Sequence, residues 1–148
     1  MVGYAPEMSD SPKPAWPTCQ ARDCRGRLLD GADRCLAHAH GHDRTAALER
    51  ITQGAPVDVA AGVRFTGELL SELLAALPRD DAGHPVLNQA DFREATIPAI
   101  DLRRASFQGT ASFDEASFQG EARFEYATFQ GDGRFYKASF RATPGFRV

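Results

Sequence analysis

The residues of this chain best suited to chemistry are three cysteines and one nearby histidine. Four residues separate Cys19 from Cys24, ten separate Cys24 from Cys35, and two separate Cys35 from His38. Thiolate and imidazole groups are the usual ligands of zinc, and four of them complete a tetrahedron with no open position for a substrate. The spacing therefore predicts a structural zinc site, with Cys19, Cys24, Cys35 and His38 as its ligands.

Other interpretations of this cluster are weaker but stay open at the level of sequence. His40 and His42 lie close enough in the sequence to replace His38 as the fourth ligand, and the alternative to a metal site is three unrelated thiols. An odd number of cysteines argues against a disulfide framework. The arginines and aspartates around the site nearly balance, which favours a solvated mixed-charge surface over a phosphate-binding patch.

The chain around this cluster divides into four segments. Residues 1–17 are rich in proline and predict a disordered lead-in, and residues 18–42 form the predicted zinc module. Residues 43–83 are expected to be a helical linker and cap: a helix over 43–53 with Asp43 as N-cap and Gly54 as its stop, a strand over 57–65, and a leucine-faced helix over 66–77 capped by Thr66. Residues 84–148 form the fourth segment, which is periodic.

The periodic segment repeats a large apolar residue every five or six positions. The anchors are Leu87, Phe92, Ile97, Leu102, Phe107, Phe113, Phe118, Phe124, Phe129, Phe135, Phe140 and Phe146. From Phe92 onward, a small residue, usually alanine, stands two positions before almost every anchor, with Ile100 and Pro144 as the departures. Residues two apart on an extended chain share a face, so each triplet sends one small and one large side chain inward. Gly109, Gly120 and Gly131 follow anchors at six-residue steps, where an extra residue is expected to need backbone freedom.

A helix does not explain this period. On a helix, Phe113 and Phe118 would lie on different faces, and the repeats are rich in phenylalanine, serine, threonine and glycine, which are mediocre or poor helix formers. Repeats of this regularity are typical of a solenoid.

Several units resemble the pentapeptide-repeat family. The matching motifs are Ala90-Asp91-Phe92-Arg93-Glu94, Ala105-Ser106-Phe107-Gln108-Gly109, Ala116-Ser117-Phe118-Gln119-Gly120 and Ala127-Thr128-Phe129-Gln130-Gly131. The resemblance implies a mainly β fold: a right-handed quadrilateral parallel β-helix with four pentapeptides per coil, here preceded by a short helical cap and the zinc module. A solenoid needs a lid over its first coil, and the leucine-faced helix 66–77 is the expected lid.

These features favour a non-enzymatic, protein-interaction scaffold. The chain has no Gly-x-Ser-x-Gly motif and no phosphate-binding loop, and His84 stands alone. The resemblance also offers an alternative, a DNA-mimicking rod that protects or inhibits a topoisomerase. Mimicry needs a dense anionic surface, whereas residues 84–148 carry eight acidic and eight basic side chains.

Composition sets the remaining expectations. The net charge of −3 gives no reason to expect nucleic acid or an acidic membrane as partner, and no apolar run is long enough to span a bilayer. With no visible secretory signal, the expected location is the cytoplasm, and the excess of arginine over lysine is typical of a GC-rich bacterial gene. The protein partner is not identifiable from the sequence. A homodimer joined through the C-terminal coil, with Phe140 and Phe146 at its centre, is one expectation.

Overall fold

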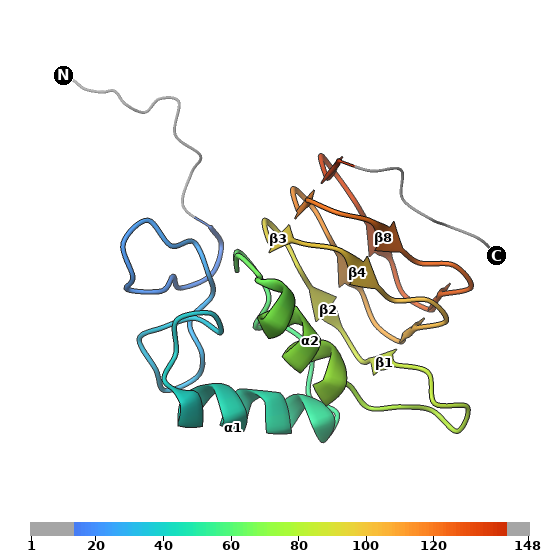
Figure 1. Ribbon diagram of the computed structural model, residues 1–148, viewed down its shortest axis with the longest axis horizontal. Helices are drawn as coiled ribbons and strands as arrows, with labels where there is room; N and C mark the ends of the chain where they lie inside the picture. The colour runs from blue at the N-terminus through green and yellow to red at the C-terminus, as the bar shows by residue number, and fades with distance from the viewer. Residues whose placement is uncertain (1–13, 142–148) are drawn as a thin grey trace.

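The structure is a computed structural model that describes residues 14–141. After an irregular N-terminal module come two helices, α1 (Gly41–Thr52) and α2 (Gly67–Ala76). Short strands follow: β1 (Val86–Leu87), β2 (Ala90–Asp91), β3 (Thr96–Ile97), β4 (Ile100–Asp101), β5 (Ser106–Phe107), β6 (Ala111–Ser112), β7 (Ser117–Phe118), β8 (Ala122–Arg123), β9 (Thr128–Phe129), β10 (Gly133–Arg134) and β11 (Ser139–Phe140). Figure 1 shows the strands winding into stacked coils, with α2 between α1 and these coils.

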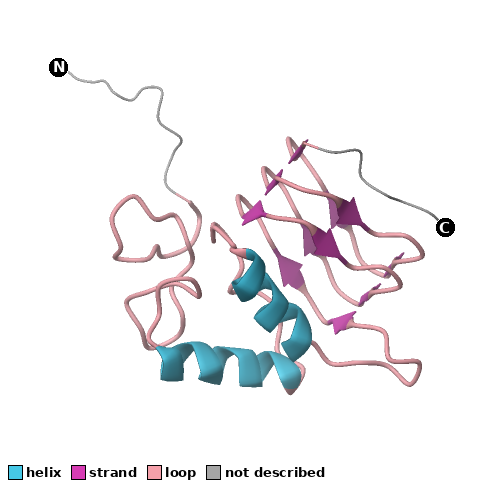
Figure 2. Cartoon of the chain, in the orientation of Figure 1, coloured by secondary structure: helices cyan, strands magenta, loops and turns pink. Residues whose placement is uncertain are grey.

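The coils have four sides, and every strand pair is parallel. Three sides carry three strands each, β1-β5-β9, β2-β6-β10 and β3-β7-β11, while the fourth carries β4-β8. Each strand thus pairs with the strand four further along the chain, which means that one coil contains four of the five- or six-residue repeats. Figure 2 shows the strands confined to this part of the chain and the helices outside it. The predicted four-sided parallel β-helix is confirmed.

The interior of the solenoid is built from the predicted small and large side chains. From Ala90 to Phe124 every anchor and every small partner is buried. Phenylalanine rings stack face to face between coils. The distance between ring centroids is 5.1 Å for Phe92 and Phe113 and 4.6 Å for Phe107 and Phe129. The residues between them face outward and are at least partly exposed, except Ser112, which is 8% exposed.

Two kinds of corner alternate along the solenoid, and step length alone does not distinguish them, because the five-residue steps after Leu87 and Ile97 have no positive φ. At the five-residue steps after Phe92, Leu102, Phe113, Phe124 and Phe135, the second residue of the corner has a positive φ although it is not glycine: Glu94, Arg104, Glu115, Tyr126 and Lys137. At the six-residue steps the glycines have no such φ. A Cβ on Gly109 would lie 2.5 Å from the carbonyl oxygen of Asn88 in the coil below. Glycine is required there because the coils approach each other closely. The expectation that these positions need backbone freedom is wrong.

Residues 57–65 form an additional half-coil beneath β2 and β3. Val57 pairs in parallel with Ala90, and Arg64 pairs in parallel with Thr96. The ring of Phe65 lies 6.2 Å from that of Phe92 and so extends the phenylalanine column downward. The predicted strand over residues 57–65 is wrong: this segment has only isolated bridges at Val57 and Arg64, with a turn between them. Its irregular spacing gave no sign that it belongs to the solenoid.

The two helices match the prediction with one error. Thr66 caps α2, its hydroxyl oxygen accepting the N–H of Leu69 at 3.1 Å. The N-cap of α1 is His40 and not Asp43, which lies in the first turn of the helix, where a carboxylate is favourable to the helix dipole. Leu69, Leu70 and Leu73 of α2 are buried in the same core as the first coil, as expected of a lid.

Two sets of expectations are outside the part of the chain just described. The lead-in up to residue 13 is one, and the last repeat, with Pro144, Phe146 and Arg147, is the other. Across residues 14–141, no helix has the length and apolar character needed to cross a membrane.

Candidate metal centre

The four predicted ligand residues come together in the N-terminal module. The sulfur and imidazole atoms of Cys19, Cys24, Cys35 and His38 all lie within 4.8 Å of one another. The Sγ atoms of Cys24 and Cys35 are 3.7 Å apart, and Nδ1 of His38 lies 3.5 Å from Sγ of Cys19 and 3.4 Å from Sγ of Cys35. Tetrahedral zinc with bonds of about 2.3 Å to sulfur and about 2.0 Å to nitrogen requires ligand atoms roughly 3.5–3.8 Å apart. These atoms could therefore hold a metal ion.

Short backbone pairings bring the ligands together from distant positions. Thr18 forms an antiparallel bridge with Arg27, and Leu28 forms one with Cys35, so residues 27–28 connect the first ligand to the third. A turn with the N–H of His38 donating to the carbonyl of Cys35, at 3.1 Å, then places the imidazole beside that thiol.

Arg44 of α1 fixes this turn from outside. Its Nε donates to the carbonyl of Leu36 at 3.1 Å and its terminal nitrogen to that of Ala37 at 3.2 Å. These carbonyls belong to the residues between Cys35 and His38, so α1 orients the second ligand pair. The sequence placed Arg44 in a helix but gave no sign of this role.

Backbone amides and one glycine complete the surroundings of the sulfurs. The N–H groups of Ala21 and Gly26 donate to Sγ of Cys19 and Cys24, at 3.4 and 3.3 Å, which stabilises the thiolate form. A Cβ on Gly26 would lie 2.8 Å from Sγ of Cys35. The loop can pass the sulfurs this closely only because residue 26 has no side chain.

The titration of the thiols fits a site that needs a cation. Burial opposes ionisation of Cys19, but the amides of Ala21 and Cys35 and the imidazole of His38 outweigh it and lower its pKa to about 7. Burial, followed by the charge of Cys24, raises the pKa of Cys35 to about 12. The pKa of Cys24 is also raised, mainly by burial. Three thiolates cannot share this volume without a compensating charge, and a divalent ion supplies it.

The other histidines lie away from the cluster. His40 is exposed at the start of α1, and Nε2 of the exposed His42 lies 3.3 Å from Asp43. His84 lies in the turn before β1, with Nδ1 3.8 Å from a carboxylate oxygen of Asp80. Of the histidines considered as fourth ligand, the structure brings only His38 to the sulfurs.

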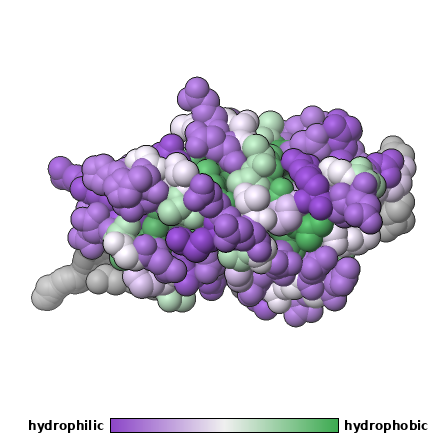
Figure 3. All heavy atoms as spheres, turned by 90° about the horizontal axis from the view of Figure 1, so that it is seen from below, coloured by the Kyte–Doolittle hydropathy of each residue, from purple (hydrophilic) through white to green (hydrophobic). Residues whose placement is uncertain are grey.

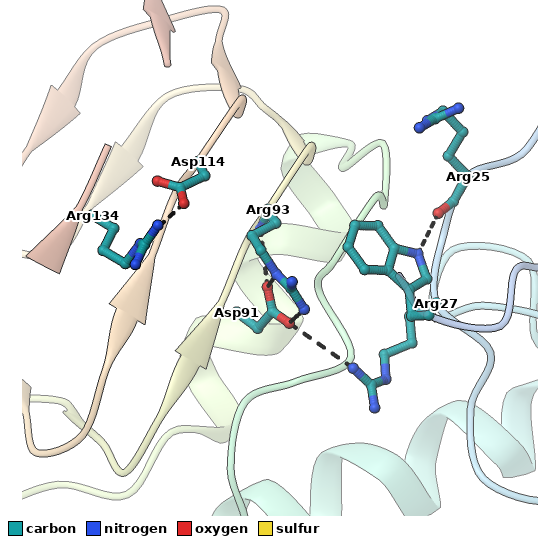
Figure 4. Close-up of polar contacts among 7 residues, drawn as sticks. Arg25, Arg27, Asp91, Arg93, Asp114 and Arg134 are labelled. Atoms are coloured by element: carbon teal, nitrogen blue, oxygen red, sulfur yellow. Dashed lines mark hydrogen bonds and ion pairs between the residues drawn. The ribbon is translucent and has the colours of Figure 1, made fainter. Parts of the chain in front are cut away.

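The loop between the second and third ligands also carries the module's contacts with the solenoid. Nε of Arg25 lies 2.7 Å from a carboxylate oxygen of Glu94, and the guanidinium of Arg27 lies 3.9 Å from Asp91. The backbone N–H of Arg27 donates to the carbonyl of Ala61 at 2.9 Å. Figure 4 shows Arg27 reaching Asp91 beside Arg93. For Arg25 and Arg27, the expectation of a merely solvated charged surface is wrong.

Trp16, the single tryptophan of the chain, lies at the centre of this contact. Its indole N–H donates to the carbonyl of Arg25 at 2.8 Å, and the guanidinium of Arg93 lies 4.9 Å from its ring centroid. Only 6% of Trp16 is exposed. The sequence placed Trp16 in the lead-in, and a lone tryptophan three residues before the first cysteine was the only available signal of its importance.

Comparison with known proteins agrees with this architecture. Residues 92–139 match the family model described as pentapeptide repeats, in nine copies. Neither the curated proteins nor the solved structures gave a significant match. The matched residues begin in the first coil, at Phe92, and end in β11. The coiled C-terminal part of this chain is therefore a pentapeptide-repeat solenoid, and it is preceded by a module whose three cysteines and one histidine form a possible metal site.

Proposed function

We propose that the chain is a non-enzymatic protein-interaction scaffold in which a structural zinc ion holds the N-terminal module on the first coil of the solenoid. One observation carries this proposal: the residues that dock on the solenoid, Arg25 and Arg27, lie in the loop between ligands Cys24 and Cys35. Zinc at the four ligand atoms would fix that loop. The module has few large apolar residues, so metal binding would supply much of its folding free energy.

A structural role for the metal is supported by the ligand set. Three thiolates and an imidazole fill a tetrahedral shell, whereas catalytic zinc sites keep a position open for water or substrate. His84, the histidine outside the N-terminal module, faces Asp80 in an exposed turn. Neither feature favours an enzyme.

The charged side chains of the solenoid do not favour DNA mimicry, because many acidic groups are paired with arginines. Arg93 pairs with Asp91 and Arg103 with Asp101, each at 2.7 Å. Arg123 pairs with Glu125 and Arg134 with Asp114, both at 3.1 Å. Acidic side chains neutralised by adjacent arginines do not form the dense anionic surface that mimicry requires. On the face drawn in Figure 3, hydrophilic side chains prevail and hydrophobic areas are scattered between them.

Metal analysis and tryptophan fluorescence test the proposal together. Protein purified without added metal should contain about one zinc per chain. Removal of the metal by a chelator should free the loop from Glu94 and Asp91, and the emission of Trp16 should shift to longer wavelength as its indole meets water. Adding zinc back should reverse the shift.

A matched pair of variants tests whether docking depends on metal binding. Cys24→Ser should lose both zinc and the buried emission of Trp16, while Ser71→Ala, an exposed change in α2, should keep both. The proposal would be contradicted by protein that binds no zinc, or by a Trp16 emission wavelength that does not change when the chelator is added.

A further inference from the structure

A cleft of about 540 Å³ lies where the metal module meets the solenoid. Cys24 and His38 of the metal centre form part of one wall, and Glu94 and Thr96 of the first coil form part of the other. Arg22, Arg25 and Arg64 also line the cleft. It exists only while the module is docked, because its walls come from both parts of the chain.

Two of these arginines have no acidic partner among residues 14–141. Arg25 is held by Glu94, at 2.7 Å. No ion pair joins Arg22 or Arg64 to a carboxylate within this range, and both side chains belong to exposed residues. The cleft thus presents two guanidinium groups that can each take a carboxylate in a bidentate contact.

The backbone at Arg64 offers a second, independent feature. Thr96 donates its N–H to Val63 and accepts the N–H of Phe65, both at 2.9 Å. In a parallel ladder the residue between two such partners turns its own N–H and carbonyl to the opposite side. Those groups of Arg64 make no backbone hydrogen bond with the described residues. Residues 63–65 therefore end the β3 face with an open strand edge beside the cleft.

We infer that this edge and cleft bind an extended acidic segment of a partner protein. The segment would add a strand below Arg64 through main-chain hydrogen bonds, the usual mode of peptide addition to a sheet edge. Its carboxylates would contact the guanidinium groups of Arg64 and Arg22. The inference rests on the proposed function, because it names the partner of that scaffold and requires the docked module.

The charge of the site favours a peptide over nucleic acid. Asp23 and Glu94 also line the cleft, so the positive charges are local and the surroundings do not continue as a basic surface. Phosphate backbones bind to extended positive surfaces, whereas two separate guanidinium groups next to a strand edge suit side-chain carboxylates.

A short fluorescein-labelled peptide of alternating glutamate and threonine is the probe, with the glutamine–threonine peptide as its counterpart. Fluorescence anisotropy with the zinc-loaded full chain should show binding of the glutamate peptide and at least about tenfold weaker binding of the glutamine peptide, as expected for the loss of charge-assisted hydrogen bonds. Arg64→Ala and Arg22→Ala should each weaken binding of the glutamate peptide by a similar factor. Arg50→Ala, which removes an equally exposed charge from α1, should leave it unchanged.

Hydrogen exchange tests the strand edge directly. The amide of Arg64 should exchange rapidly in the free protein and become protected on addition of the glutamate peptide. Equal binding of both peptides, binding unaffected by the loss of Arg64, or full displacement by inorganic phosphate at a concentration equal to that of the peptide would overturn the inference. Zinc content and Trp16 emission are measured in the same samples. If zinc is bound and Trp16 is buried but the peptide does not bind, the result contradicts this inference and leaves the proposed function intact.

Discussion

Gly26 lies directly against Cys35: a Cβ at position 26 would be 2.7 Å from the Cβ of that cysteine. Since neither backbone can retreat without moving a ligand sulfur, we expect Gly26→Ala to lower zinc affinity by about 10- to 100-fold, the usual range for changes that disturb ligand orientation. Competition with a chromophoric zinc chelator measures this directly.

Gly41→Ala is the matched control for this substitution. Gly41 is the first residue of α1, and a Cβ there would meet nothing within 4 Å. Zinc affinity should stay unchanged, and equal losses in the two variants would show that the position next to Cys35 is not special.

The solenoid was predictable because its code is local and repeated. The inward alanines and phenylalanines follow from alternation along the chain, and glycines mark the corners at the six-residue steps. The proximity of the three cysteines and His38 was also predictable, because their spacing limits how they can meet. In both cases the information lies within a few residues of sequence.

The docking contacts were not predictable for the opposite reason. The pairs Arg25–Glu94 and Arg27–Asp91 join residues that are 69 and 64 positions apart, and nothing local marks them as partners. The half-coil at 57–65 was missed because it holds one aromatic anchor, Phe65, and no repeat. The choice among His38, His40 and His42 required the turn that follows Cys35.

A substitution at Gly62 tests docking of the module separately from metal binding. It has a φ of +69°, and a Cβ there would lie 2.1 Å from the carbonyl oxygen of Arg25 and 3.1 Å from the ring of Trp16. We expect Gly62→Ala to push the module off the first coil and to shift Trp16 emission to longer wavelength, while the chain still binds zinc. Gly67→Ala, with nothing within 4 Å, should leave the emission unchanged. Loss of zinc in Gly62→Ala would mean that docking is required for metal binding.

β7 offers a direct test of the inward and outward assignment. Phe118 is fully buried, with its ring stacked 4.6 Å from that of Phe140, whereas the adjacent Ser117 faces outward. We expect Phe118→Ala to lower the free energy of unfolding by about 3–5 kcal/mol. Ser117→Ala should lower it by under about 0.5 kcal/mol. Urea denaturation measures both, and similar losses would contradict the assignment.

The pair Asp101–Arg103 predicts a pH dependence. The hydrogen-bonded guanidinium of Arg103 holds the pKa of Asp101 below its ordinary value. A carboxyl whose pKa is lowered by folding stabilises the protein above its unfolded-state pKa, about 4, and this contribution disappears as the pH falls through the lower folded-state value. Because both side chains are about half exposed, we expect Arg103→Gln to lower the free energy of unfolding only slightly at pH 7.

Carboxyl titration followed by NMR provides the direct measurement for this pair. In Arg103→Gln the pKa of Asp101 should rise toward its ordinary value, because the group that favours the carboxylate is gone. An unchanged pKa would show that the backbone N–H of residue 103, which also donates to Asp101 at 3.1 Å, is sufficient to lower it.

The last described coil predicts self-association. Phe129, Phe135 and Phe140 are half-buried, whereas the rings on which they stack, Phe107, Phe113 and Phe118, are fully buried. An end-to-end homodimer would cover these rings and pair the strand edges of the two copies. We therefore expect sedimentation at micromolar concentration to show a dimer. Phe140→Asp should convert it to a monomer, while Ser139→Asp, the same charge on the outward side of β11, should not. Circular dichroism must show both variants folded, and a wild-type chain that stays monomeric at every concentration would contradict the prediction.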